Sequence, residues 1–90
     1  MWELQYSTQF KKDLKRIKHD NAKINALQSV LIQLTNNGAV DASYKPHMLS
    51  GEYSGYMECH VQNDFLLIWV DQDAKTIKLV RVGSHSELFK

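Results

Sequence analysis

The sequence predicts an α+β fold, in which an N-terminal strand and a two-helix hairpin pack on one face of an antiparallel sheet of about four strands. Apolar residues recur at helical spacing in the first half of the chain and at strand spacing in the second half. The 90 residues contain no internal repeat, low-complexity stretch or linker. Residues 1–90 are therefore expected to form one compact domain.

The N-terminal half is expected to contain one short strand and two helices. Residues 2–6 alternate weakly and indicate the strand. Ser7 or Thr8 can cap the first helix, and Asp20 can cap the second after a short break. Gly38 can take the left-handed conformation that ends many helices. The apolar positions of the two helical stripes are Phe10, Leu14 and Ile17, then Ile24, Leu27, Val30, Leu31 and Leu34.

The C-terminal half is expected to be a three-stranded meander. Residues 39–51 are predicted to form a loop, because they contain the only proline and a Ser-Gly turn signal. Strands are predicted at residues 56–61, 65–70 and 77–82, separated by short polar turns. The middle strand is apolar throughout, as expected of a strand that is buried on both faces. Residues 83–90 are predicted to be a loop or a single helical turn.

Cysteine content and hydropathy bear on the compartment. The only cysteine is Cys59, so no disulfide can form within the chain, and a reducing cytoplasm is the expected location. The N-terminus lacks the basic and apolar regions of a signal peptide. The longest apolar run, at residues 65–70, is too short to cross a bilayer, so no membrane association is predicted.

Basic residues are concentrated in the predicted first helix and the turn after it. Only Asp13 and Asp20 oppose them, which leaves a local charge of +4, although the whole chain carries only +1. Two interpretations remain open: a solvated helix face, or a surface that binds a polyanion such as nucleic acid. The six basic residues are Lys11, Lys12, Lys15, Arg16, Lys18 and Lys23.

Several side chains suited to acid–base chemistry lie in the second half of the chain. Imidazole has a pKa near working pH and suits proton transfer, while arginine binds phosphate oxygens through a fork of N–H donors. Each residue also has a structural explanation: an aspartate in a turn, a surface histidine, or an Arg81–Glu58 ion pair on the sheet. The candidates are His47, His60, Asp64, Arg81, His85 and Phe89.

Two competing uses of these groups have weaker support. Three histidines and an aspartate could bind zinc, but their spacing matches no zinc-site pattern, so no metal or other cofactor is predicted. Cys59 could be a nucleophile, yet it lies between apolar residues on its strand face, where a buried thiol is usual.

Three segments of the chain resemble, in order, the motifs of the YafQ branch of the RelE-like toxins of bacterial toxin–antitoxin systems. The first contains a histidine, a Leu-Ser-Gly turn and two tyrosines. The second joins a strand histidine to an aspartate four residues later. The third runs from an arginine through Gly-Ser-His to Leu-Phe. The segments are residues 44–56, 58–69 and 81–89, and residues 6–14 also resemble the start of the family. Asn63 and Phe65 depart from the family's usual proline and tryptophan.

The resemblance implies a metal-free endoribonuclease that cuts mRNA in the ribosomal A site through attack by a 2′-OH on the adjacent phosphate. It also implies a small cognate antitoxin that blocks the toxin. The expected catalytic positions are His47, His60, Asp64, His85, Arg81 and Phe89. The expected RNA or ribosome contacts are Lys11, Lys12, Lys15, Arg16, Lys18 and Phe65.

Two other functions remain as alternatives. A gyrase-inhibiting, ParE-like toxin would share the fold but lacks this histidine set. An RNA-binding domain without catalytic activity would retain affinity for RNA and cleave nothing.

Overall fold

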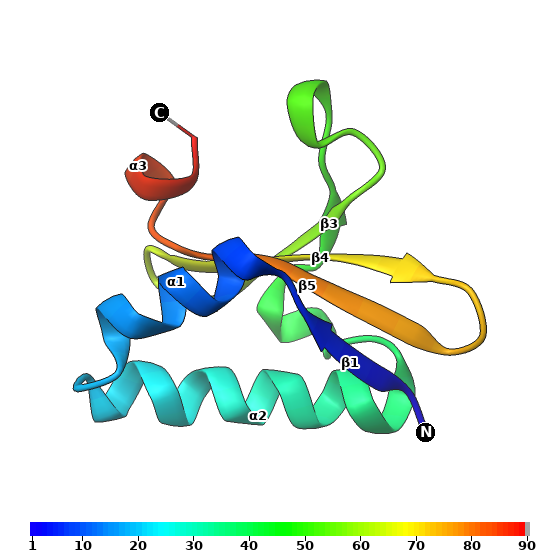
Figure 1. Cartoon of the computed structure of the whole chain (residues 1–90), viewed down its shortest axis with the longest axis horizontal. Coiled ribbons are helices and arrows are strands. Elements are labelled where there is room, and N and C mark those ends of the chain that lie inside the picture. Colours follow the sequence, from blue (N-terminus) through cyan, green and yellow to red (C-terminus); the bar gives the residue numbers. More distant parts are fainter. Residues whose placement is uncertain (90) are drawn as a thin grey trace.

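The predicted α+β class is confirmed by a computed structural model, which describes residues 1–89 (Figure 1). Lys90, the end of the predicted tail, lies outside the described residues. In chain order the elements are β1 (Glu3–Tyr6), α1 (Thr8–Ile17), α2 (Asn21–Asn37), the 3-10 turn η1 (Ala42–Tyr44), β2 (His47–Met48), the 3-10 turn η2 (Gly51–Tyr53), β3 (Met57–Gln62), β4 (Phe65–Gln72), β5 (Thr76–Gly83) and α3 (His85–Leu88).

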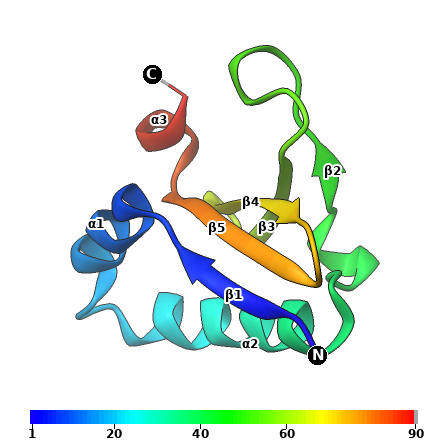
Figure 2. The ribbon, with the colours of Figure 1, turned by 45° about the vertical axis from the view of Figure 1, so that its right-hand side comes forward.

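The sheet differs in detail from the antiparallel, roughly four-stranded sheet that the sequence predicts. It has five strands in the order β1-β5-β4-β3-β2, and β1 pairs with β5 in parallel. The additional strand β2 is only two residues long and lies within the predicted loop. After β1, the helical hairpin carries the chain to the opposite edge of the sheet. The β3–β4–β5 meander then returns across the sheet, so that β5 lies beside β1 and runs parallel to it (Figure 2). Such long-range pairing leaves no local signal in the sequence.

Local hydrogen bonds fix the helix ends where the sequence predicts them. The Ser7 side chain accepts from the N–H of Phe10 at 3.0 Å, and that of Asp20 accepts from the N–H of Lys23 at 3.1 Å. Gly38 ends α2 in the left-handed region, with φ of 69°. Within residues 1–89, no helix combines the length and apolarity needed to cross a membrane.

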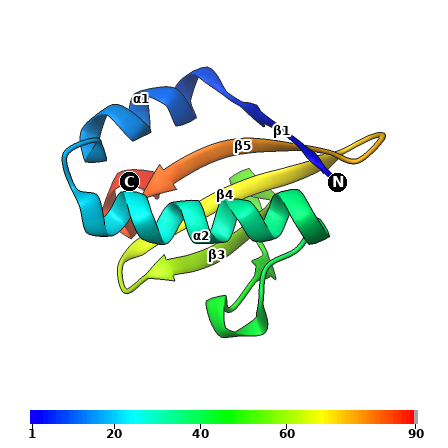
Figure 3. The same ribbon diagram turned by 90° about the horizontal axis from the view of Figure 1, so that it is seen from below.

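One face of the sheet packs against the helices. Figure 3 shows α2 lying over the sheet, roughly along the direction of its strands, with α1 near the edge formed by β1 and β5. Leu27, Val30 and Leu34 of α2 are buried against inward-facing residues of the strands, such as Cys59 and Trp69. This packing leaves the opposite face of the sheet free for other elements.

The opposite face carries a second, smaller core. Leu66 and Ile68 of β4 are completely buried there, together with Leu88 of α3. Figures 1 and 2 show α3 and the β2–η2 arm on the side of the sheet away from α2. Strand β4 is therefore buried on both faces, as its apolar sequence predicts. We call this second side of the sheet the site face, because it carries the predicted chemical groups.

Candidate active site

Three histidines from three different elements form a row on the site face. His60 lies on β3 in the middle, with ring centroids 6.2 Å from His47 and 6.3 Å from His85. The sheet positions His47 and His60. His47 on β2 lies opposite Glu58 on β3, and Glu58 is two residues before His60, so the two β3 side chains point to the same side of the sheet. The first turn of α3 supplies His85. The row thus combines groups that are separated by 13 and 25 residues in the sequence.

Asp64, in the β3–β4 turn, orients His85. Its Oδ1 accepts the backbone N–H of His85 at 2.9 Å and lies 3.0 Å from the ring Nδ1. These hydrogen bonds hold the pKa of the Asp64 carboxyl below its ordinary value. Because an ionised carboxylate only accepts, Nδ1 of His85 carries a proton. Nε2 of that ring is then the nitrogen left to exchange protons with a substrate.

His47 has an oxygen near each of its ring nitrogens. Its Nδ1 donates to the carbonyl of Lys45 at 2.9 Å, and its Nε2 lies 3.1 Å from Oε1 of Glu58. The Glu58 side chain is 4% exposed, and its Oε2 has no partner in the described part of the chain. The Arg81–Glu58 pair that the sequence allowed is therefore wrong, because Glu58 pairs with His47 instead.

A β-bulge turns Arg81 toward the site face. Strict alternation along β5 would place Arg81 on the core side with Ile77 and Leu79. The register between β4 and β5 shifts, however, so that Trp69 opposes Leu79 while the preceding Ile68 opposes Arg81. One additional residue on β5 reverses the side to which the following residues point. Arg81 thereby shares the face of Ile68, which belongs to the second core.

Arg81 is paired with a buried aspartate from α1. Its Nε and Nη2 donate to the carboxylate of Asp13 at 2.8 and 3.2 Å, and this bonding raises the pKa of Arg81. In the sequence, Asp13 stands out only as a charge opposing nearby lysines, whereas in the structure it is 1% exposed. A signal was present, because position 13 lies on the apolar stripe between Phe10 and Leu14.

A hollow of about 400 Å³ adjoins the histidine row on the α3 side. Arg81, Tyr53 and Phe89 are among the residues that line it. Phe89 is 40% exposed, and its ring lies 5.9 Å from that of His85 and 5.7 Å from that of Tyr53. An arginine beside an exposed ring, that of Phe89, and a half-buried one, that of Tyr53, suits a phosphate and an unstacked base. Tyr53 was not predicted as a site residue, although it falls within the first family-like segment.

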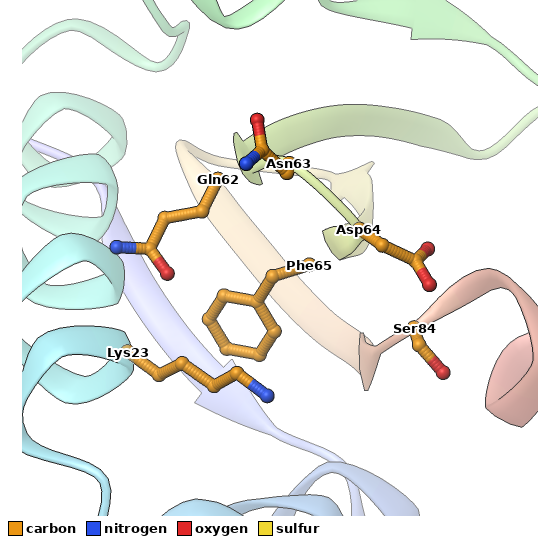
Figure 4. Close-up of a pocket in the computed structure, with 6 residues that line it drawn as sticks. All are labelled: Lys23, Gln62, Asn63, Asp64, Phe65 and Ser84. Atoms are coloured by element: carbon orange, nitrogen blue, oxygen red, sulfur yellow. The ribbon is translucent and has the colours of Figure 1, made fainter.

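A second hollow, of about 670 Å³, lies beyond Asp64. Figure 4 shows that it is lined by groups from α2, the β3–β4 hairpin and Ser84, the N-cap of α3. Phe65, predicted as an RNA contact, is only 2% exposed, and the amine of Lys23 lies 5.4 Å from its ring centroid. Its ring therefore belongs to the core and to the lining of this hollow rather than to an open stacking surface. The lining residues are Lys23, Gln62, Asn63, Asp64, Phe65 and Ser84.

The predicted basic residues lie exposed along α1, next to α3. Arg16 joins the two helices, because its Nη1 lies 3.2 Å from Oε2 of Glu87 while its Nη2 donates to Asp13 at 2.8 Å. The basic surface therefore adjoins the helix that carries His85. Its residues are Lys11, Lys12, Lys15, Arg16 and Lys18.

The structure gives two further results on the competing chemistries. Cys59 is completely buried, and burial raises the pKa of its thiol to about 12; both observations oppose a role as nucleophile. Among residues 1–89, no three or more histidine, cysteine, aspartate or glutamate side chains are arranged to hold a metal ion.

Comparison with known proteins agrees with the motifs around this site. The model of a family described as the bacterial toxin of type II toxin–antitoxin system, YafQ, matches residues 2–90. The chain belongs to this family. The family-like segments of the sequence are thereby confirmed as a true relationship, and the histidine row lies within them.

Individual relatives cover nearly the whole chain. The mRNA interferase toxin YafQ of Escherichia coli (strain K12) is 35% identical over 97% of this chain and 95% of its own. The crystal structure of the E. coli DinJ-YafQ complex contains a chain that is 34% identical to this one. The match covers 100% of this chain and 100% of that chain, with a TM-score of 0.85. A metal-bound toxin from Helicobacter pylori is 36% identical, covers 99% of this chain and 100% of its own, and also has a TM-score of 0.85.

Proposed function

We propose that this protein is an mRNA interferase: an endoribonuclease toxin that cuts mRNA in the bacterial cytoplasm. The observation that carries the proposal is the row of His47, His60 and His85 beside Arg81 and Phe89. This geometry provides proton-transfer groups, a cation and an aromatic ring on one face of the protein. The E. coli relative that shares 35% of its residues bears the name of this activity, which supports the same assignment.

The proposed reaction uses the nucleophile that RNA itself carries. A base removes the proton of the 2′-OH, whose oxygen bonds to the neighbouring phosphorus. The bond from phosphorus to the 5′-oxygen breaks, and an acid gives that oxygen a proton. The products are a 2′,3′-cyclic phosphate, which water can open to a 3′-phosphate, and a free 5′-OH. Metal-free catalysis of this step needs two proton-transfer groups and a cation for the phosphate charge.

Hydrogen bonding supports a division of these roles among the histidines. One ring nitrogen of His47 donates to a backbone carbonyl and the other lies 3.1 Å from the Glu58 carboxylate, which suits a positioning or charge-stabilising role. His60 and Nε2 of His85 are then the pair that transfers protons, and Asp64 holds the second of these rings in place. Arg81 stabilises the phosphate, and the ring of Phe89 stacks on a base next to the cut.

The basic face of α1 supports a ribosomal setting for the cleavage. Arg16 of this helix lies 3.2 Å from Glu87 of α3, so the basic surface of α1 adjoins the helix that carries His85. Clustered lysine and arginine residues bind phosphates by releasing counterions. We propose that mRNA in the ribosomal A site is the substrate and that α1 contacts ribosomal or messenger RNA.

A cognate antitoxin is the proposed protein partner. The related E. coli toxin has been crystallised in a DinJ-YafQ complex, and the present chain covers all of that toxin chain. A positive helix and an open site face suit an acidic or amphipathic segment of such a partner. The segment would block the histidine row or the basic surface.

One experiment tests the reaction directly. The protein is incubated with an RNA oligomer, and with the same oligomer lacking the 2′-OH at the cleavage site, both free and on ribosomes. We expect cleavage of the first oligomer only, with a cyclic or 3′-phosphate product, and we expect EDTA to leave any cleavage of the free RNA unchanged. Equal cleavage of the two oligomers would contradict the mechanism, and loss of free-RNA cleavage in EDTA would favour a metal-dependent one.

A matched pair of histidine variants tests the site. His60→Ala removes the central ring of the row, and we expect it to lower the cleavage rate by roughly 10²–10⁴-fold. His19→Ala removes an exposed histidine from the turn between α1 and α2, outside the row, and is expected to cleave normally. Equal activity of the two variants would exclude His60 from catalysis.

A further inference from the structure

Asp13 is the most densely bonded side chain away from the histidine row. Its side chain is fully buried, yet its two carboxylate oxygens accept five hydrogen bonds from four residues. A buried carboxylate that is satisfied this completely can remain ionised, because its partners replace the lost water. The donors are Nε and Nη2 of Arg81, Nη2 of Arg16, Nε2 of Gln9 and the backbone N–H of Val82, at 2.8, 3.2, 2.8, 3.3 and 3.0 Å.

These bonds lie at the β-bulge that orients Arg81. Strand β1 ends at Tyr6, so the bulged part of β5 has no neighbouring strand on that edge. The start of α1 supplies its partners instead: the Ser7 hydroxyl donates to the carbonyl of Val80 at 2.9 Å, and Asp13 accepts the N–H of Val82. Asp13 therefore bonds the arginine side chain and the backbone immediately after it.

We propose that Asp13 is a positioning residue for Arg81, and that it acts on the reaction only through this arginine. It binds one edge of the guanidinium in a fork and holds the bulge in register, so that Arg81 lines the hollow beside Phe89 in one orientation. The Arg81 side chain is then already ordered before RNA binds, so stabilising the phosphate costs no further side-chain entropy. The inference rests on the proposed function, in which Arg81 meets the scissile phosphate.

The first test is the isosteric variant Asp13→Asn. The amide keeps the shape but loses the charge, and its NH₂ group cannot accept from Arg81 or from the Val82 N–H. A misplacement of about 1 Å at a reacting centre can cost about 10²-fold in rate, so we expect kcat to fall by roughly 10–100-fold, while KM changes much less. If the variant does not fold, Asp13→Glu keeps the charge but moves it by one methylene, and the same loss of kcat is expected.

A double-mutant cycle separates positioning from general damage. In an Arg81→Ala background, Asp13→Asn is expected to change kcat by less than about threefold, because the group it positions is gone. Effects that multiply in the double variant would overturn the proposal, as would an unchanged kcat in a folded Asp13→Asn protein. Gln9→Ala, which removes only the long bond from an exposed amide, is the matched control and is expected to retain kcat.

A second measurement does not depend on activity. In an ¹⁵N–¹H NMR spectrum, the Nε–H of Arg81 is expected to exchange slowly with water in the wild-type protein, because it donates to a buried carboxylate. Asp13→Asn should make this exchange fast, whereas Val30→Ala, a core truncation in α2, should leave it slow. Fast exchange in the wild-type protein would refute the positioning role. Absence of RNA cleavage by the wild-type protein, with slow exchange intact, would instead refute the proposed function alone.

Discussion

Asp64 accepts two hydrogen bonds from a single residue, His85: one from the backbone N–H at 2.9 Å and one from the ring Nδ1–H at 3.0 Å. The carboxylate thereby fixes both the start of α3 and the rotation of the imidazole. It also sets the tautomer, since the proton on Nδ1 leaves Nε2 as the nitrogen available to a substrate. A turn residue and a helix residue 21 positions apart in the sequence thus function as one acid–base unit.

This pair predicts non-additive loss of activity. Asp64→Ala is expected to lower the RNA cleavage rate by about 10²-fold, within the usual range for loss of proton-transfer catalysis. Adding Asp64→Ala to His85→Ala should cost little more, because the aspartate acts through the ring. Single-turnover kinetics with an RNA oligomer checks both points. Asp73→Ala, in the exposed β4–β5 turn, is the control and should retain the full rate.

The same carboxyl predicts a pH dependence of stability. Hydrogen bonds from His85 lower the pKa of Asp64 in the folded state, and unfolding returns it toward 3.8. The ionised carboxylate therefore stabilises the fold above the unfolded pKa, and this contribution is lost as the pH falls through the lowered folded pKa. Thermal unfolding in a His85→Ala background, which keeps the backbone donor, should show the advantage of Asp64 over Asp64→Ala at neutral pH. The advantage should shrink below about pH 4. An advantage that grew on acidification would contradict the assignment.

The burial of Glu58 predicts that replacing its carboxylate will restore stability to a variant that lacks His47. Within residues 1–89, His47 is the only side-chain partner of Oε1, and Oε2 has none. His47→Ala therefore leaves both oxygens of this buried carboxylate without a side-chain partner from that part of the chain. We expect the free energy of unfolding to fall by about 1–3 kcal/mol. Glu58→Met has a similar size without polar oxygens, and it should raise the stability of the His47→Ala protein. Urea unfolding of the four combinations tests this prediction, which fails if Glu58→Met destabilises both backgrounds equally.

Burial of the lone cysteine predicts chemical inertness. The Cys59 side chain is inaccessible, and its thiol pKa is raised to about 12 by burial, so the reactive thiolate is scarce at pH 8. Iodoacetamide is expected to leave the native protein unmodified over hours and to alkylate it rapidly in denaturant. Mass spectrometry measures both. Rapid alkylation of the folded protein would show that β3 opens readily.

At the end of α2, the structure leaves no room for a side chain on Gly38. Gly38 has φ of 69°, and a Cβ added there would lie 2.5 Å from Cε2 of Trp2. Gly38→Ala is expected to lower the free energy of unfolding by about 2 kcal/mol or more, from backbone strain and displacement of the indole. Gly51→Ala is the control, since φ is 71° but no atom lies within 4 Å. Equal losses in the two variants would show that the Trp2 contact is unimportant.

Features determined by neighbouring residues could be predicted from the sequence. The caps at Ser7, Asp20 and Gly38 each depend on hydrogen bonds or dihedral angles within a few residues. The apolar run of β4 likewise indicated a strand buried on both faces. The family-like segments identified the residues of the histidine row, because a motif preserves residue types at fixed spacing.

The pairing of those residues could not be predicted, because it depends on elements far apart in the chain. The bulge on β5 reverses the side of the sheet to which Arg81 points, and no residue near Arg81 indicates this shift of strand register. The choice of Asp13 over Glu58 as its partner depends on where α1 meets β5, across 68 positions.

By itself, then, the sequence determined the family, the helix ends, the buried strand and the set of residues with the right chemistry. Only the tertiary structure decided which ring nitrogen of His85 is left for a substrate, which carboxylate lies beside His47, His85 and Arg81, and on which face of the sheet Arg81 lies. The physical reason is that local periodicity and capping act over a few residues. Strand register, β-bulges and buried ion pairs, in contrast, are fixed only when distant elements pack together.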